Sequence, residues 1–398
     1  MEKSNFLLHF SQSFFYLFTA FGIIFIPFPF HLFSYQEKIT NFVFGKIISS
    51  IKPYIFENSK YEQIVSDSSS LYILILLLVL IALIIQFIFR NHIKFKKYLL
   101  QVMNIVIPYY LSLILLKYGF DKVFMGQFYS PESNILYTPF GFLDKDILFW
   151  STIGISPTFN LFLGLSQITT AFLLLFKKTR FFGFILAIFI FTNIVAINIS
   201  FDISVKVFSI FLLFMSFLGL VIYKHIFIRI IKEIKTTYSK IYLLSKNNFL
   251  YAFLKSFVIL LFLFEVLYLN IQKNTSINNS YSNFIGAYLV TETLEDNILI
   301  KNHNIKRFFI HKNGYFIFQN LNDQMTDYKL QIFKDKHQFV ITDYNLKKTK
   351  INYKKKDSLL VLEFIKNNKK YQLKGKMLNT QSLPLFRDNL HWTIDEIK

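Results

Sequence analysis

The chain has 398 residues, 53% of them hydrophobic, and a mean hydropathy of +0.40, which excludes an ordinary soluble globular protein and favours a polytopic membrane protein. The formal charge of +20 is spread over many loops instead of one groove, so it argues against nucleic acid and for the anionic headgroups of a lipid bilayer as partner. The absence of cysteine excludes disulfides, thiolate catalysis and Cys-bound metals.

Seven apolar stretches approach the roughly 20 residues that a helix needs to cross a bilayer. They are residues 10–30, 71–89, 99–117, 158–176, 181–199, 205–223 and 249–269. We interpret the first as a retained helix and not a signal peptide, because no small-residue cleavage site follows cleanly and Pro27 and Pro29 interrupt its far end. The pattern therefore predicts about seven transmembrane helices.

The loops between these stretches alternate in charge. Loops 90–97, 177–180 and 224–246 are rich in Lys and Arg, whereas the intervening loops balance their charges. Because basic loops are retained on the cytoplasmic side, the pattern predicts a bacterial cytoplasmic-membrane protein with its N-terminus in the cytoplasm and its C-terminal domain outside.

Two loop segments carry structure of their own. The apolar residues of 39–51 recur at helical spacing, which suits either a helix lying in the outer interface or an ordinary helix packed on the bundle. Residues 118–150 are rich in Gly, Pro and aromatics, and we expect them to fold back over the outer mouth of the bundle.

The tail from about residue 281 changes to short β-type runs separated by Asn, Asp, Gly and Lys. These runs are 285–290, 306–310, 315–319, 330–333, 339–342, 359–364 and 371–377. Their spacing predicts a small antiparallel barrel or sandwich. A lipocalin-like cup, suggested by Gly286-Ala-Tyr288 and Arg387, and a filled interaction module both stay open.

The predicted organisation has five parts. They are N-terminal helices with an interfacial loop (1–98), a membrane core (99–225), a basic cytoplasmic segment with the last helix (226–270), a linker (271–282) and a β-rich domain (283–398).

Polar side chains within apolar helices are costly, so their positions point to function. The candidate ligand-binding residues are Tyr118, Asp121, Lys122, Gln127, Gln167, Asn193, Asn198, Asp202 and Lys206. All but Gln167 fall in the outer half, which predicts a polar pocket there, roofed by the β domain. Asn193 and Asn198 point roughly 140° apart on a helix, so at most one lines it.

A structural interpretation competes with this pocket. Asp202 and Lys206 have the i, i+4 spacing of a modest bridge at a helix start, and amides in membrane helices often serve packing alone. The eight His residues show no metal-ligand spacing, and no nucleophile elbow, P-loop or dinucleotide fingerprint is present, so we expect no metal site and name no catalytic residue.

Glycines and polar residues between 118 and 209 carry a resemblance to a known family. They are Tyr118-Gly-Phe-Asp-Lys122, Gln127-Phe128, Trp150, Gly154, Gly164, Gln167, Asn193, Asn198, Asp202, Lys206 and Ser209. On these residues the chain resembles the DoxX-like family of small bacterial membrane proteins. More narrowly, it is similar to a long Bacteroidetes version with added N-terminal helices and a β-rich tail ending in a motif like His391-Trp392. The membrane resemblance covers about residues 99–223.

The resemblance implies a four-helix membrane core and, from the founding members, association with quinone-linked sulfur oxidation. A quinone is then an implied cofactor and a membrane redox protein an implied partner. Gln167 stands where an acid is expected, and Ile210 or Phe211 where a His would follow Ser209, which argues against a proton-transfer role.

Three functions are compatible with these patterns. The first is an accessory or ligand-binding component acting on a quinone or lipid at the outer leaflet. The second is a membrane enzyme similar to vitamin K-dependent carboxylases, in which Lys122 would be the base with a strongly lowered pKa. The third is a small-molecule transporter whose β domain captures substrate, although no internal inverted repeat is evident.

Overall fold

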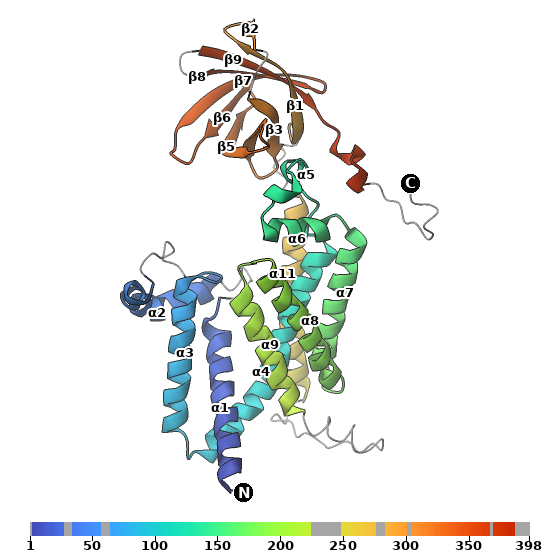
Figure 1. The fold of residues 1–398 in the computed structure, drawn as a ribbon. Coiled ribbons are helices and arrows are strands. Elements are labelled where there is room, and N and C mark those ends of the chain that lie inside the picture. Colours follow the sequence, from blue (N-terminus) through green and yellow to red (C-terminus); the bar gives the residue numbers. More distant parts are fainter. Residues whose placement is uncertain are drawn as a thin grey trace. The chain divides into compact units, whose positions relative to one another are not determined.

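A computed structural model describes residues 2–27, 34–56, 64–223, 248–275, 283–300, 304–366 and 369–386 (Figure 1). The chain divides into two compact units. The helical unit comprises Met1–Gln127 and Thr158–Tyr268, and the barrel unit comprises Phe128–Pro157 and Leu269–Lys398. The basic loop 224–246, residues 276–282 of the linker, Arg387 and the His391-Trp392 motif lie outside the described residues.

The helical unit has a helix at each of the seven predicted positions and one more between the first two. They are α1 (Glu2–Phe25), α2 (Ser34–Ile55), α3 (Ser69–Ile88), α4 (Ile93–Val123), α7 (Pro157–Leu175), α8 (Arg180–Ser200), α9 (Lys206–Ile222) and α11 (Asn248–Thr275). In the described part of the chain, α3, α4, α7 and α8 are long and apolar enough to cross a membrane; α1, α9 and α11 contain shorter apolar stretches. The number of crossings stays a prediction.

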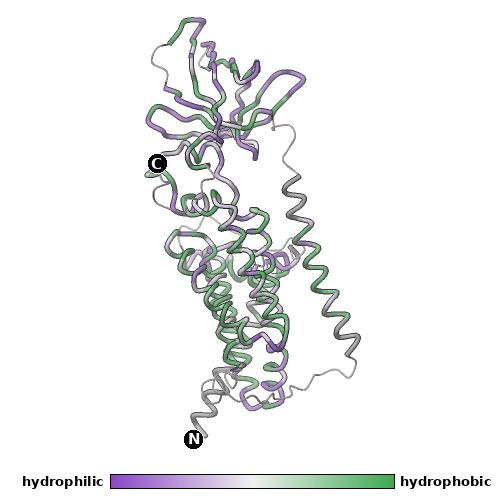
Figure 2. Tube along the Cα trace, turned by 90° about the vertical axis from the view of Figure 1, so that its right-hand side faces the viewer, coloured by the Kyte–Doolittle hydropathy of each residue, from purple (hydrophilic) through white to green (hydrophobic). Residues whose placement is uncertain are grey.

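Hydrophobic residues predominate along the helices of this unit (Figure 2). On α3, Leu74, Leu78 and Ala82 follow one another at four-residue spacing and are fully buried, while Leu80 and Ile84 on the other face are 54% and 58% exposed. A helix that is hydrophobic all round is typical of a segment surrounded by lipid, because water would penalise its outer face.

Helix α2 confirms that the segment around 39–51 is helical. Phe42 and Tyr54 are 88% and 90% exposed, whereas Phe44 and Ile48 are buried. At its start, the side-chain amide of Gln36 donates a hydrogen bond of 2.8 Å to the carbonyl oxygen of Ile26, just after the end of α1. The helix thus carries one packed face and one exposed apolar face.

The barrel unit contains nine antiparallel strands. They are β1 (Gly286–Glu295), β2 (Ile298–Leu299), β3 (Ile305–His311), β4 (Tyr315–Asn320), β5 (Met325–Phe333), β6 (Gln338–Thr342), β7 (Lys348–Lys356), β8 (Leu359–Lys366) and β9 (Lys369–Met377). Strand β1 pairs with both β3 and β9, which closes eight strands into a barrel, and the short β2 adds a hairpin to β1. The structure therefore confirms the predicted barrel.

Aromatic side chains occupy the interior of the described barrel. Tyr288, Phe308, Phe316 and Phe339 are fully buried, and the rings of Tyr288 and Phe308 stack with centroids 4.9 Å apart. Because period-2 alternation points these residues inward from each strand, they form one continuous core.

Strand β7 was not predicted from the sequence. Five of its nine residues are Lys, a residue depleted in strands, so the segment looks like a solvated loop. Its Ile351 and Tyr353 nevertheless point into the core and are buried, and pairing with β6 and β8 holds the strand in place. Four of the five lysines are left on the outer wall, whereas Lys355 lies over the Phe284 ring.

The connection between α4 and α7 packs on the barrel. It contains α5 (Ser133–Leu136), a 3-10 turn η2 (Phe140–Phe142) and α6 (Lys145–Gly154). The carbonyl oxygen of Tyr137 accepts a hydrogen bond of 3.0 Å from Gln319 on β4, and its ring packs beside Phe309 on β3. Sequence patterns assigned this segment to the membrane core and to the mouth of the bundle, whereas the structure groups residues 128–157 with the barrel.

Candidate functional site

Two glycines bring α4 and α7 into close contact. A methyl group added at Gly164 would lie 2.7 Å from the carbonyl oxygen of Gly119, and one added at Gly119 would lie 3.0 Å from that of Gly164. Small residues of this kind let the backbones of membrane helices approach each other. Farther along the same pair of helices, the hydroxyl of Ser112 on α4 hydrogen-bonds to the carbonyl oxygen of Ala171 at 3.1 Å.

The glycine contact positions Lys122 and Gln167. Each lies three residues after its glycine, nearly one helical turn, so each falls on the contacting face. Lys122 is 6% exposed, and its ammonium donates to the side-chain oxygen of Gln167 at 3.2 Å. Gln167 itself is 3% exposed.

Two further oxygens contact this ammonium. Lys122 Nζ donates to the side-chain oxygen of Gln127 at 2.6 Å and to the carbonyl oxygen of Tyr118 at 3.4 Å. It also lies 5.6 Å from the centre of the Tyr118 ring, within the range of a cation–π interaction. These contacts give Lys122 neutral oxygens and an aromatic face as neighbours, and the carboxylate of Asp121 also attracts the ammonium.

The end of α4 turns Gln127 back toward Lys122. Met125 has a φ of 52°, in the left-handed region. The N–H groups of Gly126 and Gln127 then donate to the carbonyl oxygen of Asp121 at 2.7 and 3.0 Å. This is the backbone reversal that ends many helices.

Asp121 contributes to the same end of α4 through its backbone and a separate ion pair. Its carboxylate contacts the ammonium of Lys117 at 2.5 Å, with the i, i+4 spacing of neighbours on a helix. Lys117 was missed in the sequence analysis, although its spacing from Asp121 was a usable signal.

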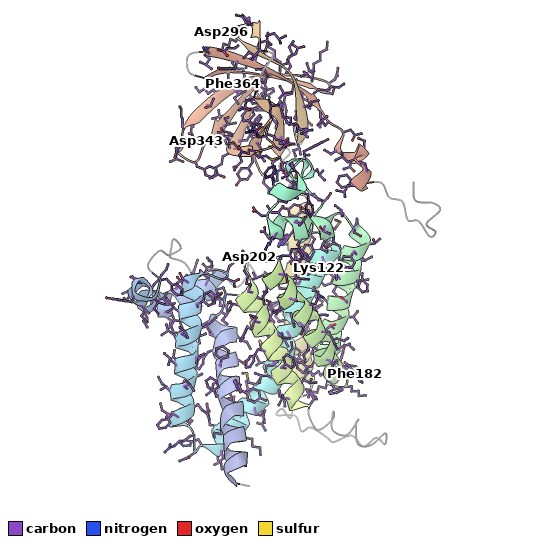
Figure 3. The ribbon with its side chains drawn as sticks, viewed as in Figure 1. Lys122, Phe182, Asp202, Asp296, Asp343 and Phe364 are labelled. Atoms are coloured by element: carbon purple, nitrogen blue, oxygen red, sulfur yellow. The ribbon has the colours of Figure 1, made fainter. Side chains whose placement is uncertain are left out.

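A second polar group forms at the start of α9. Asn198 donates to the hydroxyl of Ser209 at 3.1 Å, and that hydroxyl donates to the carbonyl oxygen of Lys206 at 2.8 Å. Lys206 forms an ion pair with Asp202 at 2.7 Å. Lys122 and Asp202 lie at the same end of the helical unit (Figure 3).

Asp67 caps α9 in this second group. Its carboxylate accepts from the backbone N–H groups of Lys206 and Val207 at 2.9 and 3.1 Å, as an N-cap does. Asp202 has a φ of 52° and a side chain that is 83% exposed. These contacts fit a helix start. No sequence signal connects Asp67 with a helix about 140 residues later.

The structure thus divides the nine predicted residues. Four of them, Tyr118, Lys122, Gln127 and Gln167, contact one another around the Lys122 ammonium. The Asp121 carboxylate instead forms its ion pair with Lys117. Asn198, Asp202 and Lys206 belong to the start of α9. Asn193 is exposed whereas Asn198 is buried, in agreement with the expectation that at most one faces inward.

A buried ammonium among amide oxygens can form strong hydrogen bonds with a carbonyl or anionic oxygen, because the surrounding dielectric is low. The described residues contain no group of three His, Asp or Glu side chains that could hold a metal ion. Hydrogen bonding and charge are therefore the chemistry that this cluster offers.

No family model matches the chain. Among curated proteins, it is similar to the uncharacterized protein YwoB of Bacillus subtilis (strain 168), with 37% identity over 100 residues. The match covers 25% of this chain and 62% of that relative. No solved structure matches.

Proposed function

We propose that this chain is a DoxX-like component of a bacterial cytoplasmic membrane, and that it binds the polar headgroup of a quinone or lipid at Lys122. The buried Lys122 ammonium carries this proposal. An ionisable side chain within a membrane helix is expensive, and it is a functional-site hypothesis by default. Its two amide partners come from different segments, Gln167 on α7 and Gln127 in the turn after α4.

The Lys122 ammonium is a hydrogen-bond donor, so its ligand must supply an acceptor oxygen. Lys122 contacts uncharged oxygens in the described structure, and an oxygen of a ligand could take the place of the Gln127 oxygen. Gln127 is the natural partner to be displaced because it lies in a turn, whereas Gln167 lies within a packed helix. A quinone carbonyl or a lipid phosphate supplies such an oxygen, and Tyr118 offers an aromatic surface to a quinone ring.

The orientation of the chain supports an outer-leaflet site. Basic loops precede α4 (90–97) and follow α7 (177–180), so the connection between α4 and α7 leaves the helices at their opposite ends. Lys122 lies at that end of α4. The connection packs on the barrel through Tyr137 and Gln319. Under the positive-inside rule, both the barrel and Lys122 then belong to the outer side.

The exposed apolar face of α2 supports attachment to the same interface. Tyr35, Ile39, Phe42 and Tyr54 are each more than half exposed, and Lys38 and Lys46 lie among them in the sequence. Aromatic and aliphatic side chains with interspersed lysines are typical of a helix lying in the headgroup region.

Binding to purified protein in neutral detergent tests the proposal. Trp fluorescence can be titrated with a short-chain quinone, and a spin-labelled anionic phospholipid can be titrated in parallel. We expect Lys122→Met to weaken binding of the true ligand at least tenfold, or about 1.4 kcal/mol. Asp202→Asn is the matched control, because its exposed carboxylate belongs to the start of α9 and should not affect binding.

The two titrations separate the ligand classes. Saturable binding of the quinone alone identifies a quinone site, and binding of the phospholipid alone identifies a lipid site. Binding of both ligands with unchanged affinity in Lys122→Met, while the variant stays folded, would reject Lys122 as the site.

A further inference from the structure

Strands β7, β8 and β9 place two columns of lysines on the outer wall of the barrel. Because β7 and β9 are both antiparallel to β8, they run in the same direction, and their residues match row by row. The registers give Lys354–Val361–Lys374 in one row and Lys356–Leu359–Lys376 in the next. In each row an aliphatic residue lies between two lysines.

The pattern continues along the strands. Lys370 pairs with Ile365, and Lys350 lies one step beyond the Ile351–Phe364 pair, which makes a third row of the same kind. The row between has Asn352, Glu363 and Gln372. We call these four rows the lysine grid. Its outer residues alternate with the buried Tyr353, Leu362 and Leu373, which point inward.

The grid has a regular spacing. Lysines two residues apart on a strand are separated by roughly 6.7 Å, and the two columns, two strands apart, by roughly 9.5 Å. Leu359 and Ile365 between the columns are 36% and 69% exposed. A linear molecule lying along β8 would have an ammonium on each side of it and an aliphatic floor beneath.

Several of these charges are not neutralised by the barrel itself. Within the described residues, Lys350, Lys356 and Lys376 form no ion pair. Lys374 pairs with Glu292 at 2.6 Å, and Glu363 contacts Lys370 at 3.5 Å and Lys354 at 4.0 Å. Row 356–376 therefore offers the strongest attraction for an anion, and Glu363 opposes one in its own row.

A shallow cavity of about 290 Å³ adjoins the grid. It is lined by Lys336, His337, Asn352, Tyr353, Lys354 and Glu363. Lys336 and His337 come from the turn between β5 and β6 and extend the basic surface sideways. The cavity would give an end or a branch of a bound anionic chain a place to lie.

We infer that the lysine grid binds a linear polyanion with closely spaced phosphate-type groups. Successive anionic groups lie along β8 between the lysine columns, and the backbone of the polymer lies on Leu359 and Val361. Charge complementarity carries the affinity, because three of the four rows supply two ammonium groups each, on either side of β8.

A bilayer surface fits the grid less well. Insertion into a headgroup layer uses protruding aromatic or long aliphatic side chains, and the outward residues of the grid include no aromatic ring. The acidic Glu363 also lies at its centre.

The test uses the full chain in neutral detergent and inorganic polyphosphate as probe. Binding is measured by calorimetry at several salt concentrations. We expect K356E/K376E to weaken binding at least tenfold and to lower the salt slope by roughly one unit or more. The control K329E/K347E has the same change in net charge, on exposed lysines off the grid, and should change affinity less than threefold.

A second variant tests the opposite direction. Glu363→Gln removes the acid from the centre of the grid, and we expect binding to tighten severalfold. Equal weakening in K356E/K376E and in the control would mean that net charge alone acts, and would overturn the grid. Lack of polyphosphate binding by the wild type would also overturn it, as would binding to anionic vesicles but not to polyphosphate.

Discussion

The two units use the same residue types in opposite ways. Phe189 on α8 of the helical unit is 69% exposed, whereas Phe308 on β3 of the barrel is fully buried. Both side chains are equally hydrophobic, so composition does not decide which one is inside. The difference fits the surroundings that we propose for the two units, because an apolar outer face suits lipid, whereas a barrel in water encloses its aromatic rings.

Polar side chains show the reverse arrangement. In the helical unit, Lys122 and Gln167 are buried and contact each other. In the barrel, the lysines of β7 and β9 stay on the outer wall, where water solvates them. A helix in lipid has to pair its polar groups internally, whereas a strand with one wet face does not.

The largest effect is expected in the barrel core. Phe308→Ala removes a fully buried ring that stacks between Tyr288 and Phe316, and it should lower the free energy of unfolding of the barrel by roughly 4 kcal/mol. Phe189→Ala on the helical surface is the control and should change stability by less than about 0.5 kcal/mol. Chemical denaturation followed by circular dichroism measures both. Equal losses of stability in Phe308→Ala and Phe189→Ala would contradict the difference between the two units.

A smaller effect is expected at the contact of α4 with α7. Gly164→Val places side-chain atoms against the backbone of Gly119, so we expect a loss of roughly 2 kcal/mol or more and separation of Gln167 from Lys122. Thermal unfolding in detergent reports the loss. Gly45→Ala, where no neighbouring atom lies within 4 Å, should keep or slightly raise stability. Unchanged stability of Gly164→Val would show that the two helices are not closely packed.

The smallest effect concerns the contact between the α4–α7 connection and the barrel. Burial lowers the pKa of His311, partly offset by the attraction of Glu132 and assisted by Lys312; Tyr315 packs beside the ring. The neutral imidazole is therefore favoured in the folded state. The stabilisation of the folded barrel unit by the neutral imidazole is fully present above the ordinary His pKa, and it is lost as pH falls through the folded-state pKa.

The stability of the barrel unit should accordingly decrease as pH falls from 7.5 to 5.5. This loss should be smaller than the loss of stability caused by Phe308→Ala or by Gly164→Val. His311→Gln should remove that part of the pH dependence, and unfolding midpoints at each pH provide the measurement. A wild-type midpoint that is constant or rises over this interval would contradict the direction derived for His311.

Several features were predictable because they are local. Helices α3 and α8 are long apolar runs, and β3 and β4 contain short, aromatic-rich apolar runs bounded by polar residues, so their positions follow from run length and hydropathy. Lys122 was recognisable as a charge at the end of an apolar run. Its contact with Gln167 was not, because the contact depends on the crossing of α4 and α7 at Gly119 and Gly164.

Other features escaped because they depend on partners far along the chain. Strand β7 is too rich in Lys to be recognised alone, and its pairing with β6 and β8 makes it a strand. Asp67 caps a helix about 140 residues away. The connection 128–157 joins two apolar helices in the sequence, yet its aromatic residues pack on the wall of β3 and β4.

The sequence by itself determined the apolar helices, the basic loops between them and the β-rich tail, because these follow from the hydropathy and charge of neighbouring residues. The tertiary structure alone decided which polar residues meet. It brought Lys122 to Gln127 and Gln167, assigned Asp202 and Lys206 to the start of α9, and aligned the lysines of β7 and β9 in rows. The reason is that helix crossing and strand register are set by packing between distant segments, which local patterns do not contain.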